Sequence, residues 1–175
     1  ANIPTYTVTT PNSADIIAVT SSTGSGSEPA IDITGSSDAM AFTELTLFDV
    51  ATVNIDTATN DGAGHDAITL TSGLDNGTDL AQGLSNLNID GGQTTDADTL
   101  TINGIVDLPG SLDIDNIETV DLNADVTAGT TLTIANVGTT IDLAADVDLT
   151  ATSGNLDLDN SVAAINLSGA TGTNS

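Results

Sequence analysis

The second half of the sequence repeats a short unit in which apolar residues alternate with polar ones. Residues 112–122 (LDIDNIETVDL), 132–143 (LTIANVGTTIDL) and 156–167 (LDLDNSVAAINL) each hold two such units on either side of an Asn corner. Alternation with a period of two is typical of β-strands, and units this short cannot form stable helices. The starts at 112, 132 and 156 set a period of 20 to 24 residues.

Repeats of this length, with two or three short strands each, predict an all-β fold of the β-solenoid class, similar to a parallel β-helix. A single coil cannot bury its apolar face, whereas stacked coils close a continuous apolar column. Residues expected in that column are Leu112, Ile114, Val120 and Leu122, with their equivalents in the other copies. A β-sandwich is the alternative, because short strands separated by regular turn signals also build that fold.

Further copies of the repeat are expected earlier in the chain. Residues 45–55 align with 112–122 without a gap, and residues 84–89 form a partial copy. A third short strand at 123–126 aligns with residues 144–147. These alignments predict which residues of successive coils lie next to one another.

Stacking in this register would align acidic side chains that point outward. Asp121 would lie above Asp142 and Asn166, and Asp125 above Asp146. Like charges directly opposite on neighbouring strands are destabilising, so such columns favour either a bridging cation or a shifted register. The Asn residues at equivalent corners are interpreted as a structural ladder that hydrogen-bonds the turns: Asn116, Asn136 and Asn160.

The repeats define the expected domain organisation. Residues 1–43 are predicted to form an extended N-terminal segment, and residues 44–175 the repeat β domain. Within the first segment, residues 21–29 are rich in Ser and Gly, which is typical of a loop or linker. The strand candidate at residues 3–10 is separated from the repeats and is free to complete a neighbouring copy's sheet by strand addition.

The charge balance calls for a counter-ion. The chain has 25 Asp and Glu, no Lys and no Arg, for a net charge of −25. Two like charges about 4 Å apart repel by roughly 1 kcal/mol even in water, and by more when they are partly buried. Because hard oxygen ligands select calcium, a compact fold of this composition predicts bound calcium. The same charge excludes binding to nucleic acid phosphates and disfavours anionic membrane surfaces.

The composition also indicates where the protein is located relative to the cell. No apolar run approaches the roughly 18 residues that a membrane span requires, and the chain has no Cys. Without disulfides, an exported protein depends on metal or assembly for cross-linking. Extracellular calcium fills even weak sites with dissociation constants of about 10⁻⁴ to 10⁻³ M. We therefore expect an extracellular or cell-surface protein.

Three Asp/Gly-rich segments are candidate calcium sites. Residues 61–69 (DGAGHDAIT) match the calcium-binding nonapeptide G-G-x-G-x-D-x-U-x at every position but the first. In that motif Gly allows a sharp turn that points carbonyl oxygens inward, and Asp adds a carboxylate. Residues 90–100 and 73–80 are degenerate versions. The candidate metal ligands are Asp61, Gly62, Gly64, Asp66, Asp75, Asp79, Asp90, Asp96 and Asp98.

With this nonapeptide and the element 116–122 (NIETVDL), residues 45–170 resemble the repeat regions of bacterial RTX-type calcium-dependent S-layer proteins and large secreted adhesins. The resemblance implies a secreted β-solenoid whose calcium drives folding or lattice assembly. The chain departs from the family in having no tandem array of perfect nonapeptides.

No catalytic set is evident, so we expect no enzymatic activity. His65 is the only His, and a general base needs an oriented partner and a nucleophile. The chain has no Trp, one Tyr and two Phe, whereas sugar-cleaving sites stack aromatic side chains. The expected function is a structural subunit that polymerises with copies of itself into an S-layer or matrix filament, with cell-surface polysaccharide as a further partner class. The alternative is a monomeric binding or spacer module of a large adhesin.

Overall fold

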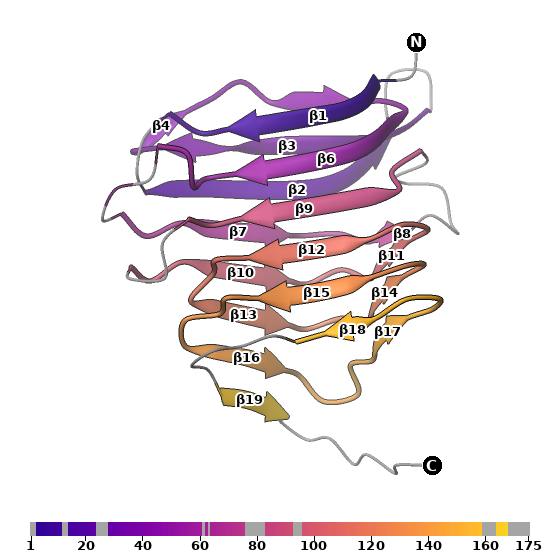
Figure 1. Ribbon diagram of the computed structural model, residues 1–175. Coiled ribbons are helices and arrows are strands. Elements are labelled where there is room, and N and C mark those ends of the chain that lie inside the picture. Colours follow the sequence, from indigo (N-terminus) through magenta and orange to yellow (C-terminus); the bar gives the residue numbers. More distant parts are fainter. Residues whose placement is uncertain are drawn as a thin grey trace, which may run out of the picture.

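The computed structural model describes residues 3–11, 14–23, 28–60, 62, 64–75, 83–92, 96–158 and 164–167, and this part of the chain is all-β without a helix (Figure 1). The strands form three sheets. Sheet A contains β1 (Ile3–Thr9), β6 (Val50–Asp56), β9 (Asn86–Asp90), β12 (Leu112–Asp115), β15 (Leu132–Ala135) and β18 (Leu156–Asp157). Sheet B contains β2 (Asp15–Thr23), β3 (Pro29–Ser37), β4 (Met40–Ala41), β5 (Leu45–Leu47), β7 (Ala67–Leu70), β10 (Thr99–Ile102), β13 (Thr119–Leu122), β16 (Thr140–Leu143) and β19 (Ala164–Leu167). Sheet C contains β8 (Leu74–Asp75), β11 (Val106–Leu108), β14 (Val126–Ala128) and β17 (Leu149–Ala151).

From β6 onward the chain visits the sheets in a fixed order, A then B then C. Each strand pairs in parallel with the corresponding strand of the next turn, as β9, β12 and β15 do in sheet A. The parallel sheets and their repeated order are compatible with a β-helix-like fold. In a β-sandwich the neighbouring strands are antiparallel, so the pairing disagrees with that alternative.

The core lies between the sheets and follows from the period-two pattern. In β12, Leu112 and Ile114 are buried while the two Asp residues between and after them face outward. Leu112 lies opposite Leu87 on one side and Leu132 on the other, so that equivalent apolar residues stack. Burying one such side chain contributes about 1.5–3 kcal/mol, and the inner columns of all three sheets join in one hydrophobic cluster.

The predicted stacking of the last three repeats is confirmed. Leu132 lies between Leu112 and Leu156, and Asp142 lies between Asp121 and Asn166. Because burial and the charge of Asp142 both disfavour its ionised form, the pKa of Asp121 is raised.

Two of the predicted alignments are wrong. Residues 45–55 do not superpose on 112–122: β5 pairs antiparallel with β3, and β6 lies in sheet A with Val53 opposite Leu87. An apolar-x-apolar pattern specifies which face of a strand is buried, but not which sheet the strand joins. Residues 144–147 are also out of register, because Val126 lies opposite Leu149 and the chain turns at Asp146, which has a φ of 63°.

The N-terminal residues belong to the same sheets as the repeats. The expectation that residues 3–10 stand apart is wrong, since β1 pairs in parallel with β6 of the same chain. Strand β2 pairs in parallel with β7 on one side and antiparallel with β3 on the other. The expected loop at 21–29 is strand at both ends, because β2 extends to Thr23 and β3 begins at Pro29. Strands from both sides of the expected 43/44 boundary therefore share sheets and core.

The antiparallel strand β3 ends the parallel ladder of sheet B at the N-terminal end. It covers the edge of β2 that would otherwise offer unpaired backbone groups to another chain. Within the described ranges, no helix is long and apolar enough to cross a membrane.

Candidate metal centre

An acidic residue stands at the start of, or directly before, four neighbouring strands of sheet B. The parallel register places Ile16 of β2, Ala67 of β7, Thr99 of β10 and Thr119 of β13 in one row. The residues that precede them therefore stack on successive coils. We call this set the carboxylate column: Asp15, Asp66, Asp98 and Glu118, which are 0%, 1%, 0% and 5% exposed.

Hydrogen bonds between coils hold the column together. The Asp15 N–H donates to Asp66 Oδ1 at 2.7 Å, and the Asp66 N–H donates to Asp98 Oδ1 at 2.7 Å. The Asp98 N–H donates to Glu118 Oε2 at 3.0 Å. Asp66, Asp98 and Glu118 thus each satisfy one backbone donor on the neighbouring coil, which a buried N–H requires. The column ends at Glu118, because the next position of the row, directly before Thr140, is Thr139, which carries no carboxylate.

The remaining oxygens of the column are buried and have no hydrogen-bond partner among the described residues. They are both carboxylate oxygens of Asp15, Oδ2 of Asp66, Oδ2 of Asp98 and Oε1 of Glu118. Asp96, which lies beside the column, has both carboxylate oxygens in the same state. A buried, unpaired carboxylate costs several kcal/mol, and the sequence has no Lys or Arg to offset the charge. A bound cation or a proton must therefore compensate these groups.

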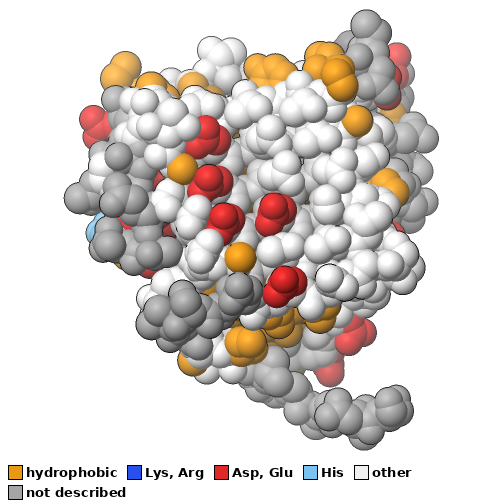
Figure 2. Space-filling model, viewed as in Figure 1, with side chains coloured by type: hydrophobic (Ala, Val, Ile, Leu, Met, Phe, Trp, Pro, Cys, Tyr) orange, Lys and Arg blue, Asp and Glu red, His pale blue; other side chains and the backbone are white. Residues whose placement is uncertain are grey.

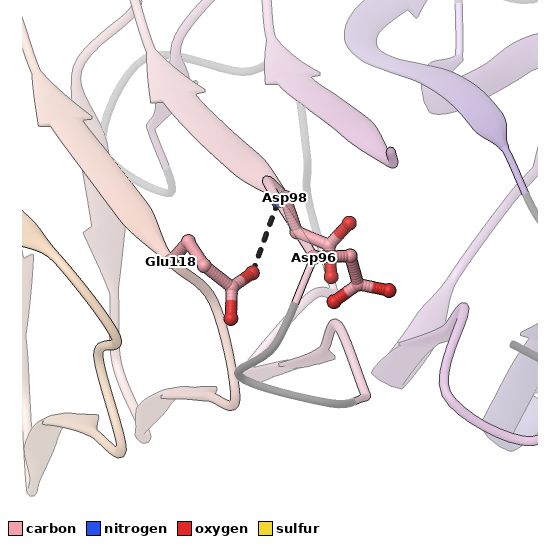
Figure 3. Close-up of side chains that lie close together, drawn as sticks. All are labelled: Asp96, Asp98 and Glu118. Carbon is pink, nitrogen blue, oxygen red and sulfur yellow. Dashed lines mark hydrogen bonds between the residues drawn. The ribbon is translucent and has the colours of Figure 1, made fainter. Parts of the chain in front are cut away.

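Three carboxylates of this group converge. Asp96, Asp98 and Glu118 each place one oxygen within 4.8 Å of the other two (Figure 3). Asp96 and Asp98 come from the segment before β10, and Glu118 comes from the residue before β13. Carboxylate oxygens at this spacing are the donors that hard cations such as Ca²⁺ take. The cluster could hold a metal ion.

Three carboxyl groups of the column, Asp66, Asp98 and Glu118, have raised pKa values. Burial raises the pKa of Asp98 to about 8, and the charges of Asp66, Asp96 and Glu118 act in the same direction. Burial likewise raises the pKa of Asp66 and of Glu118. Hydrogen bonds from the Asp15 backbone and the Thr57 hydroxyl oppose the shift at Asp66. A cation beside these groups would favour their ionised forms, so protons and a metal ion compete for the same oxygens.

The structure brings three of the sequence-predicted ligands together, namely Asp66, Asp96 and Asp98. It places Asp90 elsewhere, at the end of β9 in a groove on the outer face of sheet A, which Asp56, Asp113 and Asp115 also line. Figure 2 shows acidic side chains gathered on that face. Gly62 and Gly64 lie in the connection from β6 to β7, and Asp75 lies in β8 of sheet C. Asp61 and Asp79 fall outside the described residues.

The Asn corners have a structural role in two coils. Asn116 and Asn136 take left-handed φ values of 55° and 50°. Their side-chain amides donate to Asp90 Oδ1 at 2.9 Å and to Asp115 Oδ1 at 2.7 Å on the preceding coil. The Asn side chains therefore bond to acids rather than to one another. Asn160 lies outside the described residues.

Asp15 and Glu118 were missed as site residues. A signal for both exists in the sequence: an acid immediately precedes an apolar-x-apolar strand in DAITL (66–70), DTLTI (98–102) and ETVDL (118–122). Asp15 begins DIIAV (15–19) in the same way. Comparison of the chain with family models, curated proteins and solved structures found no match.

Proposed function

We propose that this chain is a calcium-stabilised β-solenoid that serves as a structural protein outside the cell. The observation that carries the proposal is the carboxylate column, in which five buried oxygens have no hydrogen-bond donor among the described residues and the chain has no Lys or Arg. A catalytic site gains from charged groups that reach a substrate, whereas these groups are sealed between coils. Their position suits an ion that joins coils.

Calcium fits this position better than other common cations. All candidate ligands are oxygens, which disfavours metals that prefer nitrogen or sulfur. Mg²⁺ demands near-ideal octahedral geometry and gives up its water reluctantly. The column offers dry, closely stacked carboxylates, which suits the larger and more flexible Ca²⁺ shell. Millimolar calcium outside cells would keep such a site filled.

The proposed assembly is a homopolymer that grows at the C-terminal end of the stack. Strands β17, β18 and β19 each have a strand partner on one side only in the described part of the chain. Leu156 and Ile165 on these strands are 46% and 44% exposed. An open edge beside exposed apolar side chains favours pairing with a second copy.

Thermal unfolding with and without a chelator tests the calcium proposal. We expect the melting temperature to fall by at least 10 °C when EDTA replaces millimolar calcium at pH 7.5. Magnesium at the same concentration should restore little of the loss. A melting temperature that does not respond to chelation would refute the proposal.

Native mass measurement and electron microscopy in millimolar calcium test the assembly. Ordered sheets or filaments are expected above a threshold concentration. A chain that stays monomeric at high concentration would contradict the homopolymer and would instead fit a spacer module of a larger adhesin.

A further inference from the structure

The N-terminal end of the carboxylate column differs from the rest in what surrounds it. In the later coils the corner between sheets A and B is filled by Ile117 and Val137, which are buried. In the first two coils, Thr10 and Thr57 follow β1 and β6 at this corner and are 2% and 0% exposed. The corner therefore changes from apolar to polar where the column reaches Asp66 and Asp15.

Several oxygens in these two coils have no hydrogen-bond partner in the part of the chain that the structure describes. They are both carboxylate oxygens of Asp15, Oδ2 of Asp66 and the hydroxyl oxygen of Thr10. The Thr57 hydroxyl lies near Asp66, whose pKa it lowers, and it donates to the carbonyl oxygens of Asp90 and Gly91, both at 3.3 Å. The carbonyl oxygen of Thr10 accepts a hydrogen bond from the Asn60 amide at 2.7 Å, whereas its hydroxyl oxygen has no partner among the described residues. Replacing these polar side chains with apolar ones would be less costly than leaving them unpaired, which indicates a ligand.

An ion bound by Asp96, Asp98 and Glu118 is too far away to be that ligand. Parallel strands lie about 4.8 Å apart, so Asp15 stands about 10 Å from Asp98 and about 14 Å from Glu118 along the column. Calcium contacts its ligands at about 2.3–2.6 Å. One ion therefore reaches oxygens on adjacent coils, but cannot serve both ends of a four-coil column.

We infer that a second calcium ion binds at the N-terminal end of the column, between the coils that carry Asp15 and Asp66. Asp15 supplies both its oxygens, Asp66 supplies Oδ2, and Thr10 supplies its hydroxyl oxygen. The inference rests on the proposed function, because carboxylates of the same column bind the first ion. Asp15 begins β2, and Asp66 directly precedes β7. The second ion thus fastens the β2–β3 hairpin to the repeats.

The number of calcium ions per chain tests the inference. The protein is first passed by gel filtration into calcium-free volatile buffer, which removes ions held weakly by surface acids. Native mass spectrometry then counts the calcium ions that remain bound. We expect two ions in the wild-type protein, one in D15N and one in E118Q. Asn at position 15 keeps the backbone N–H that donates to Asp66, so only the ligand oxygen charge is lost. D157N, which removes an exposed Asp of β18, should keep both ions.

The outcomes separate the two proposals. A single ion that survives D15N and disappears in E118Q overturns the second site and leaves the proposed function standing. Two ions that both survive D15N also overturn the second site. No retained ion in the wild-type protein overturns the proposed function and this inference with it.

Thr10→Val supplies a second variant in case D15N does not fold, because it replaces the hydroxyl by a methyl group of the same shape. Calorimetric titration should then show one of two affinities weakened by at least tenfold. Unchanged affinity at both sites overturns the inference.

Discussion

Asp98→Asn should stabilise the metal-free protein at pH 7 and remove the part of the calcium response that is due to the ion held by Asp96, Asp98 and Glu118. Asp98 is fully buried, and its pKa is raised to about 8. Asn keeps Oδ1 as the acceptor for the Asp66 N–H but carries no charge. The substitution therefore removes the ionisable group while it preserves the hydrogen bond that joins the two coils.

The size of the effect follows from proton linkage. A carboxyl group whose folded pKa is raised contributes stability below its unfolded pKa, and this contribution is lost as the pH rises towards the folded pKa. Each pKa unit corresponds to about 1.4 kcal/mol. Between pH 4 and pH 7, the metal-free wild-type protein should therefore lose about 4 kcal/mol at Asp98 alone, and D98N should avoid that loss. In a chain of this size the difference corresponds to roughly 10 °C in melting temperature.

The assay is urea unfolding followed by circular dichroism at pH 4.5 and pH 7, in EDTA and in calcium. In EDTA, D98N should be about as stable as wild type at pH 4.5 and more stable at pH 7. Calcium at a hundred times its dissociation constant for the site of Asp96, Asp98 and Glu118 should add about 2.7 kcal/mol more to the wild type than to D98N. D157N should behave as wild type throughout. The reasoning is refuted if D98N is destabilised equally at both pH values in EDTA, or if calcium stabilises both proteins equally.

Three further predictions concern the stack. Leu112→Ala should cost about 2–5 kcal/mol, because Leu112 is fully buried between coils and its removal leaves a cavity, and urea unfolding measures the loss. Asn116→Ala should cost about 1–3 kcal/mol through its left-handed φ and the lost bond to Asp90, whereas Asn116→Gly should recover the part due to φ; equal losses in the two variants would contradict this account. Chelation should speed amide hydrogen exchange in β2 and β7 more than in β15, since only the former pair adjoins the column; uniform acceleration would argue against local fastening by the ion.

The sequence predicts the later coils well and the earlier ones poorly. Leu112, Leu132 and Leu156 stack as expected because the intervening chain keeps a nearly constant length. Ile17 and its neighbour Ile68 are 51 residues apart, since the β3–β5 segment and the rest of the intervening chain interrupt the period. A period-two pattern alone could not reveal that pairing. The sequence alignment equates Val53 with Val120 of sheet B, whereas Val53 lies in sheet A, because an apolar-x-apolar pattern suits a strand of either sheet.

The sequence predicts only part of the candidate site, because the residues of the site lie in different kinds of sequence segment. Asp66, Asp96 and Asp98 lie in Gly- and Asp-rich segments that suggest calcium loops. Glu118 lies in an ordinary repeat, and Asp15 lies in a segment with no repeat at all. Only the strand register shows that these acids share a column. Their burial, which makes the unpaired oxygens significant, depends on side chains from several coils and could not be inferred from any one motif.

Asp98 and Glu118 each stand one residue before a strand of sheet B. The chain can therefore lose one complete turn while the strands on either side stay in register. Thr99 lies opposite Thr119, with Asp98 and Glu118 directly before them. Deleting residues 99–118 would join Asp98 to Thr119, remove one turn of the chain and leave the neighbouring turns in register. The molecule would become shorter by about 4.8 Å while keeping both ends unchanged. Gene duplication or loss of such a segment could therefore change its reach without the need to evolve a new core.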